Sequence, residues 1–141
     1  MAIVMADDDL DDCRLVADAW EKADCSGAIE FVTGGAELLE RLRRRSSSDA
    51  PQTDVVLLDL NMPGVDRWAV LAEMAAVSFL SSTPVVVLTT SKSDVDIRRA
   101  YAAGASGFVT KPALFSELVK LLKTIDDYWF GTSTLPGSSG L

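Results

Sequence analysis

The sequence predicts an α/β fold in which a parallel sheet of five strands lies between two layers of helices. Short apolar runs alternate five times with amphipathic stretches, and this alternation is typical of that fold class. The runs are almost continuously apolar, which indicates strands that are buried on both faces and therefore parallel. A chain of 141 residues, of which 48% are hydrophobic, is also long enough for one domain with a proper core.

The five predicted strands are short, rich in apolar and β-branched side chains, and bounded by Asp, Gly, Pro or Thr. In chain order they are Ile3–Ala6, Ile29–Val32, Asp54–Leu58, Pro84–Leu88 and Gly107–Val109. Each is followed by a segment with helical periodicity, so right-handed crossovers restrict the possible topologies to a few.

The five predicted helices carry apolar residues three or four positions apart. In chain order they are Leu10–Asp24, Ala36–Arg45, Arg67–Val77, Asp94–Ala103 and Leu114–Asp127. The apolar face of the first is expected to hold Leu10, Cys13, Val16, Ala17 and Trp20. Gly104 is well placed to end the fourth helix, because glycine readily adopts the left-handed conformation found there.

We expect one domain over residues 1–127 and a tail over residues 128–141, whose Gly131–Leu141 portion is rich in Gly, Ser, Thr and Pro. Ser46–Thr53 is the longest predicted loop. No apolar run reaches the roughly 18 residues of a membrane span, and no secretion signal is visible. The sequence therefore predicts a cytoplasmic protein, with Cys13 and Cys25 as reduced thiols.

The composition excludes several kinds of chemistry. The chain has no histidine, so it can form neither a histidine-based triad nor a zinc site with imidazole ligands. Its net charge of −8 makes nucleic acid an unsuitable direct partner. Four arginines in a row of five residues, Arg41, Arg43, Arg44 and Arg45, are interpreted as a charged helix end, with a partner-docking patch as the alternative.

Polar side chains follow the predicted strands where ligands bind in open parallel sheets. Asp7 and Asp8 follow the first strand, Asp59 ends the third, Thr89 ends the fourth, and Lys111 follows the fifth. Three carboxylates at one sheet edge repel one another, and a single lysine does not compensate them. A hard divalent cation would restore the balance, and Mg²⁺ suits carboxylates, carbonyls and phosphate oxygens.

Each of these features also has a purely structural interpretation. Asp7–Asp12 could be a capped helix start, Thr89 and Thr90 a turn or helix cap, and Lys111 an ordinary lysine whose stem is buried. Asp59 is harder to explain in this way, because it directly follows a buried strand, where an unpaired charge is costly. The placement of these residues at the ends of four different strands favours a functional site.

Together these residues resemble the receiver domain of two-component response regulators. The resemblance covers roughly residues 2–127 and rests on four motifs: Ala6–Asp9, Asp59–Gly64, Leu88–Ser91 and Thr110–Pro112. Each motif is weak by itself, but all four in this order and spacing are specific. The resemblance implies a three-layer (βα)5, flavodoxin-like fold with strand order 2-1-3-4-5.

The resemblance also implies a function for the acidic residues. Asp59 would be the phosphoacceptor, taking a phosphoryl group from the phosphohistidine of a partner histidine kinase. Asp7, Asp8 and Asp59 would bind Mg²⁺ together with the backbone carbonyl of Asn61. The chain would then be a signalling switch rather than an enzyme, with a downstream protein target.

Further roles follow from the same resemblance. Thr89 and Lys111 would hold the phosphoryl oxygens, and Thr89 with Phe108 would form the switch that reshapes a protein-binding face. Asn61 and Ser91 would tune dephosphorylation. The Lys111–Pro112 peptide bond would be cis, an isomer that costs little before proline.

A closer resemblance is to stand-alone regulators that partner phytochrome-type histidine kinases. It rests on Leu88–Ser91, Asp96–Tyr101 and the segment from Tyr128 to Pro136. It implies a homodimer through the side of the fifth strand. The alternative for Trp129 and Phe130 is that they pack on their own domain.

Two departures and three rival functions remain. Leu10 replaces a common proline after the acids, and Arg67 replaces a usual glycine near the site. An aspartyl-phosphate phosphatase needs a second Asp where Asn61 stands. A flavodoxin-like flavin binder needs a phosphate cradle where Asp7–Asp9 would repel phosphate. The third rival is a receiver-like scaffold that is never phosphorylated.

Overall fold

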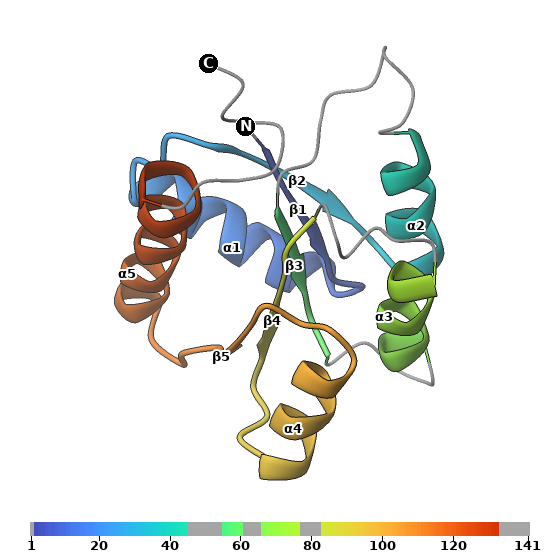
Figure 1. The fold of residues 1–141 in the computed structure, drawn as a ribbon. Helices are drawn as coiled ribbons and strands as arrows, with labels where there is room; N and C mark the ends of the chain where they lie inside the picture. The colour runs from blue at the N-terminus through green and yellow to red at the C-terminus, as the bar shows by residue number, and fades with distance from the viewer. Residues whose placement is uncertain (1, 45–54, 61–65, 77–82, 133–141) are drawn as a thin grey trace.

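The sheet has the predicted composition and order. In the computed structural model, residues 2–44, 55–60, 66–76 and 83–132 are described. All strand pairs are parallel and the order is β2-β1-β3-β4-β5 (Figure 1). The strands are β1 Ala2–Ala6, β2 Ala28–Val32, β3 Val55–Leu58, β4 Val85–Thr89 and β5 Gly107–Thr110. The predicted fold class and strand order are therefore confirmed.

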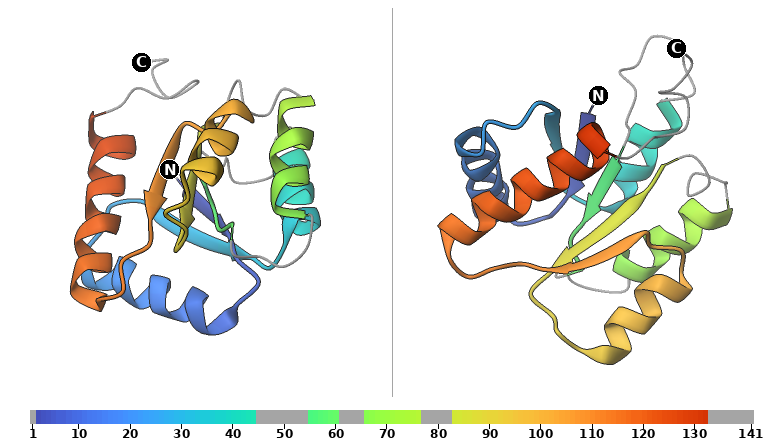
Figure 2. Two further views of the ribbon diagram at one scale, coloured as in Figure 1. Left: turned by 90° about the horizontal axis from the view of Figure 1, so that it is seen from below. Right: turned by 60° about the vertical axis from the view of Figure 1, so that its left-hand side comes forward.

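Five α-helices alternate with the strands. They are α1 Leu10–Lys22, α2 Gly35–Arg44, α3 Asp66–Ala76, α4 Asp94–Ala102 and α5 Phe115–Asp126, and a π-helical segment, η2 Asp127–Thr132, continues α5. Helices α1 and α5 cover one face of the sheet, while α2, α3 and α4 lie toward the other (Figure 2). None of the helices in the described ranges is long and apolar enough to cross a membrane.

The core is divided by the sheet into two parts because successive strand residues point to opposite faces. Val4 and Ala6 pack toward α2 and α3, whereas Ile3 and Met5 pack toward α1 and α5. All five residues of β1 are buried, as are those of β4. Each fully buried aliphatic side chain stabilises the fold by roughly 1.5–3 kcal/mol, so the sheet is a firm base for the residues that follow its strands.

The ends of two helices follow the predicted local chemistry. The Asp9 carboxylate caps α1 by accepting hydrogen bonds from the backbone N–H groups of Asp11 and Asp12. Gly104, with a φ of 107°, follows the end of α4 as expected. The prediction for Leu10 was wrong: it is 62% exposed, because the helix begins there, before its first buried position at Cys13.

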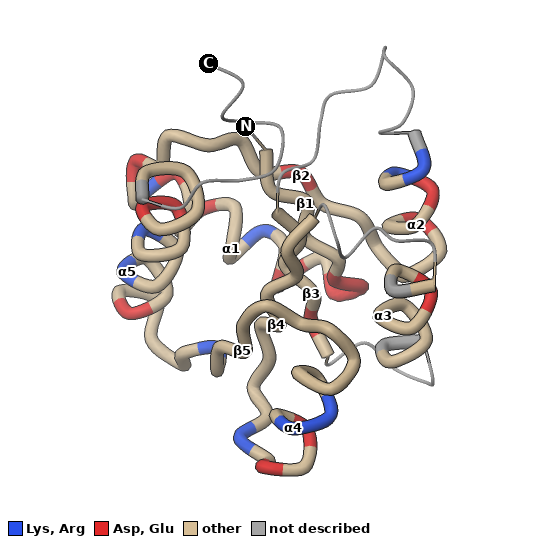
Figure 3. The backbone as a smooth tube through the Cα atoms, in the orientation of Figure 1, with Lys and Arg blue, Asp and Glu red and all other residues tan. Residues whose placement is uncertain are grey.

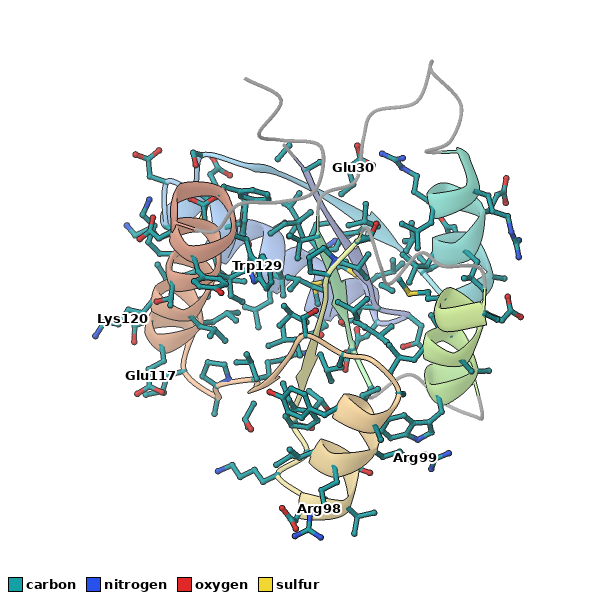
Figure 4. The ribbon with its side chains drawn as sticks, viewed as in Figure 1. Glu30, Arg98, Arg99, Glu117, Lys120 and Trp129 are labelled. Carbon is teal, nitrogen blue, oxygen red and sulfur yellow. The ribbon has the colours of Figure 1, made fainter. Side chains whose placement is uncertain are left out.

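The described part of the predicted tail, residues 128–132, contacts the domain through two aromatic side chains. Trp129 and Phe130, in η2, contact the core between the sheet and α1 and α5. Trp129 is labelled in Figure 4. Their packing on their own domain, one of the two interpretations of these aromatic residues, is therefore confirmed. The rest of the predicted tail, and the predicted loop 46–53, lie outside the described residues.

Candidate functional site

The site lies at the carboxyl end of the sheet, where backbone hydrogen bonds continue past the strands. The N–H of Asp7 donates to the carbonyl of Val32 at 3.0 Å, and the N–H of Asp59 donates to the carbonyl of Ala6 at 3.1 Å. The N–H of Lys111 donates to the carbonyl of Thr89 at 2.6 Å. The sheet therefore fixes the backbone of the three charged residues that follow it. Figure 3 shows that acidic residues gather where β1 leads into α1.

Three carboxylates and one ammonium group meet at this edge. Asp7, Asp12 and Asp59 each offer an oxygen, and these oxygens all lie within 4.8 Å of one another. The Lys111 ammonium donates to Oδ2 of Asp59 at 3.2 Å and to Oδ2 of Asp12, and it lies 3.8 Å from Oδ2 of Asp7. Only 8% of the Lys111 side chain is exposed, so it is a member of the site rather than a lysine whose head group reaches solvent.

One oxygen of Asp7 has no hydrogen-bond donor. Asp7 is 1% exposed, and its Oδ1 accepts the N–H of Asp9 at 3.0 Å, but its buried Oδ2 accepts no hydrogen bond. A buried carboxylate oxygen in this position loses its hydration without replacement. It is the kind of atom that a cation would bind.

The charges at the site change one another's protonation. Burial and the neighbouring carboxyl groups of Asp12 and Asp59 raise the pKa of Asp7 to about 8. Burial also acts to raise the pKa of Asp12, but hydrogen bonds with Asp7 and Lys111 outweigh it and hold that pKa below its ordinary value. For Lys111, burial is outweighed by Asp12 and Asp59, which raise its pKa.

The grouping of acids differs from the sequence prediction in one member. Asp8 is exposed at the turn and is not in the cluster, whereas Asp12, from the first turn of α1, is. Asp12 precedes the buried Val16 by four positions and the buried Trp20 by eight, so helical periodicity places it on the side facing the sheet. That spacing is the sequence signal for Asp12, which the pattern of strand ends does not contain.

The predicted phosphoryl-binding and switch residues lie on neighbouring strands. Thr89 is fully buried, and its hydroxyl accepts the N–H of Ser91 at 3.3 Å. Phe108 is half-buried against the core on the α2, α3 and α4 side. The cap of α4 is Ser93, not Thr89 or Thr90, so the helix-cap interpretation of the two threonines is wrong.

The remaining predictions for this region have mixed outcomes. No peptide bond between described residues is cis, so the expected cis bond between Lys111 and Pro112 is wrong; trans is the lower-energy isomer. Asn61, expected to contribute a backbone carbonyl, lies outside the described residues, as does the side chain of Arg67. Arg41 and Arg43 form ion pairs with Glu30 and Glu73, as fits a charged helix end.

The donor set fits a hard divalent cation. Three carboxylates against one ammonium group leave a net charge of −2 when all are ionised. Oxygen ligands of this kind suit Mg²⁺ or Mn²⁺ and do not suit a soft metal. The buried Oδ2 of Asp7 supports the fit independently of the charge count.

Comparisons with known proteins agree on one family. The family described as "Response regulator receiver domain" matches residues 3–123. The chain is 36% identical over 135 residues to the probable methanogenesis regulatory protein FilR2 of Methanothrix harundinacea, covering 96% of this chain and 87% of that protein. It is 30% identical over 137 residues to the response regulator Rcp1 of Synechocystis, covering 96% and 93% of the two.

Solved structures give the same result. The phosphorylated cyanobacterial phytochrome response regulator RcpA superposes with a TM-score of 0.82 at 34% identity, over 96% of this chain and 97% of that one. The Mn²⁺-bound form of Rcp1 superposes with a TM-score of 0.80 at 30% identity, over 96% and 98%. Both superpositions cover nearly the whole of this chain.

Proposed function

Because this chain belongs to the response regulator receiver family, we propose that Asp59 accepts a phosphoryl group from a histidine kinase. Members of this family are signalling phosphoacceptors rather than catalytic enzymes, which decides against the phosphatase. The observation that carries the proposal is the position of Asp59. Its carboxylate is buried beside the Lys111 ammonium and next to an Asp7 oxygen that has no hydrogen-bond donor.

The transfer needs little covalent help from the protein. A carboxylate oxygen of Asp59 would attack the phosphorus of the kinase phosphohistidine, forming an O–P bond while the P–N bond breaks. The electron pair of that bond stays on the imidazole nitrogen, which can then take a proton. Catalysis of phosphoryl transfer rests on positioning and charge neutralisation, and Lys111 contributes both at the edge of the sheet.

We propose Mg²⁺ as the cation of the site, held by Asp7 and Asp59, with Asp8 and the Asn61 carbonyl as the further ligands expected from the sequence. The ion would neutralise charge on the transferred oxygens. The Mn²⁺-bound form of Rcp1 supports a divalent ion in such a site. Among the buried side-chain oxygens of the described residues, Oδ2 of Asp7 has no hydrogen-bond partner and would gain one ligand bond from the ion.

The switch would connect the site to a binding face. A phosphoryl group on Asp59 adds acceptor oxygens, toward which the Thr89 hydroxyl could turn. Movement of Thr89 would leave room for Phe108, which lies on the neighbouring strand β5 and pairs with Val87, two residues before Thr89. The face formed by α4, β5 and α5 would then change shape, which is a local charge event biasing a bistable element.

The partner would be a kinase of the phytochrome type, by likeness to the phytochrome response regulator RcpA. We also propose that the exchange takes place in the cytoplasm. A homodimer through β5 is supported by an apolar groove of about 340 Å³ between β5 and the C-terminal helix. Val109, Leu121 and Trp129 are among its lining residues. Measuring the molar mass by light scattering, for wild type and Leu121→Glu, tests the dimer.

Labelling of Asp59 tests the main proposal. Wild type, Asp59→Asn and the control Asp18→Asn are incubated with acetyl phosphate and Mg²⁺, and the intact mass is measured. We expect one phosphoryl group on wild type and on Asp18→Asn, whose acid is exposed on α1, and none on Asp59→Asn. Absence of labelling on wild type would favour the scaffold that is never phosphorylated.

A further inference from the structure

Asp12 stands out in the site because it lies on a helix, while Asp7, Asp59 and Lys111 follow strands. Its carboxylate accepts a hydrogen bond from the ammonium of Lys111, which lies 99 positions away in the sequence. We propose that Asp12 is a positioning residue, which holds Lys111 before phosphorylation and competes with the phosphoryl group for it. The inference rests on the proposed function, since it gives Asp12 a role in the same phosphoryl-binding site.

The position of Asp12 is fixed by its helix. Asp9 caps α1 and accepts the N–H of Asp12 at 3.2 Å, so the backbone of the first turn is held. The side chain of Asp12 is 18% exposed and lies on the row of Val16 and Trp20, which are buried against the sheet. Its carboxylate is therefore presented to the site by the core packing of α1.

The N-terminus of α1 does not need the Asp12 carboxylate for its stability. Capping is done by Asp9, and the favourable interaction of an acid with the helix N-terminus is also supplied by Asp11, which is exposed. Asp11 stands one residue away, on a side that does not reach the site. The helix accounts for an acid at Asp11 but not for the contact between Asp12 and Lys111.

More than one carboxylate accepts a hydrogen bond from the ammonium of Lys111. It has three donor protons, and Asp12 and Asp59 each accept from it while Asp7 lies 3.8 Å away. A phosphoryl group on Asp59 would bring further anionic oxygens to the same ammonium. Each hydrogen bond that the Lys111 ammonium keeps with Asp12 is one that it cannot donate to the phosphoryl group.

Charge repulsion adds to this competition. The site has a net charge of −2 with all groups ionised, and Asp12 supplies one of its three negative charges. Phosphorylation increases the negative charge at Asp59. Removal of the Asp12 charge should therefore strengthen the binding of a phosphoryl group, opposite to the effect of removing an ordinary site residue.

Beryllofluoride, which mimics a phosphoryl group on a carboxylate, gives a direct test. Its dissociation constant is measured by calorimetry or by NMR titration at a Mg²⁺ concentration that saturates each variant, found by a separate Mg²⁺ titration. The variants are Asp12→Asn, the charge-retaining Asp12→Glu, the matched control Asp11→Asn on the same helical turn, and Asp59→Asn.

We expect Asp12→Asn to bind beryllofluoride about three- to tenfold more tightly than wild type. Asp12→Glu and Asp11→Asn should remain near wild type, and Asp12→Asn should need more Mg²⁺ for saturation. A weakening or no change with Asp12→Asn, while wild type binds, would overturn the inference and leave the proposed function standing. Failure of wild type itself to bind beryllofluoride would instead overturn the proposed function.

Discussion

Asp7 and Asp126 are both 1% exposed, but their surroundings differ. The Asp126 carboxylate, at the end of α5, accepts the N–H of Ser26 at 3.0 Å and the N–H of Gly27 at 3.1 Å, and the Ser26 hydroxyl donates to it as well. Lys123 lies 3.8 Å from it. Asp7, in contrast, has one oxygen with no donor and two other carboxylates beside it.

The difference separates an acid that stabilises the fold from one that we propose binds a cation. Hydrogen bonds replace the hydration that Asp126 loses, so its charge joins α5 to the α1–β2 turn and contributes to stability. Asp7 is buried without that replacement, so its charge works against the folded state until a cation arrives. Burial alone would not distinguish the two residues, but the hydrogen-bond inventory of each oxygen does.

Replacement of Asp126 should have the largest effect. Asp126→Ala leaves the N–H groups of Ser26 and Gly27 without their acceptor, so we expect the free energy of unfolding to fall by about 2–4 kcal/mol. Chemical denaturation in Mg²⁺-free buffer measures it. An effect within about 0.5 kcal/mol, the range of ordinary surface changes, would show that the hydrogen bonds of Asp126 with Ser26 and Gly27 do not stabilise the fold.

Replacement of Asp7 should act in the opposite direction. At pH 8 without divalent cations, Asp7→Asn removes a repelled charge, and we expect the free energy of unfolding to rise by about 1–3 kcal/mol. Stabilisation by added Mg²⁺ should be lost in the same variant. If Asp7→Asn were as destabilising as Asp126→Ala, the contrast between the two acids would be refuted.

The pH dependence of stability should reveal the same charge. A carboxyl group whose pKa is raised from 3.8 to about 8 binds more protons when folded than when unfolded in that interval. The free energy of unfolding should therefore fall as pH rises from 5 to 7, by up to about 1.4 kcal/mol per unit. The window is clear because the chain has no histidine. If the free energy of unfolding of Asp7→Asn fell with pH by the same slope, another group would be responsible for the pH dependence.

Substitution of Gly27, whose N–H donates to the Asp126 carboxylate, should have the smallest effect. A Cβ atom at Gly27 would lie 2.5 Å from the ring of Phe130, so the ring must shift. Because the obstacle is the half-buried end of a side chain, we expect Gly27→Ala to cost about 1 kcal/mol in free energy of unfolding. In the double variant Gly27→Ala with Phe130→Leu, most of this loss of stability should disappear. If the loss were unchanged, its cause would be the backbone conformation at Gly27 rather than the Phe130 ring.

Most of the fold could be predicted from the sequence because the strands are read directly from short apolar runs such as Val55–Leu58. The position of Asp59 and Lys111 at strand ends followed from the same pattern, since parallel strands present their carboxyl ends at one edge. The exposure of Leu10 was mispredicted because periodicity does not say at which residue a helix becomes buried.

Asp12 could not be found by listing strand ends, because it reaches the site from a helix. Its contact with Lys111 depends on how α1 lies against the sheet, a tertiary property. The hydrogen bonds of Asp126 could not be predicted for a similar reason, since the donors, Ser26 and Gly27, are 100 and 99 positions away in the chain. The spacing of Asp12 to Val16 and Trp20 indicates on which side of α1 it lies, but no periodic signal identifies the partner that it meets there.

A crystal structure of the wild-type protein with Mn²⁺, using anomalous scattering, tests the central claim most directly. We predict an anomalous peak at about 2.2 Å from Oδ2 of Asp7, with an oxygen of Asp59 in the same coordination sphere. The absence of a peak there at saturating Mn²⁺, or a peak bound only at other acids, would contradict the assignment of Asp7 and Asp59 as the metal-binding part of a phosphoacceptor site.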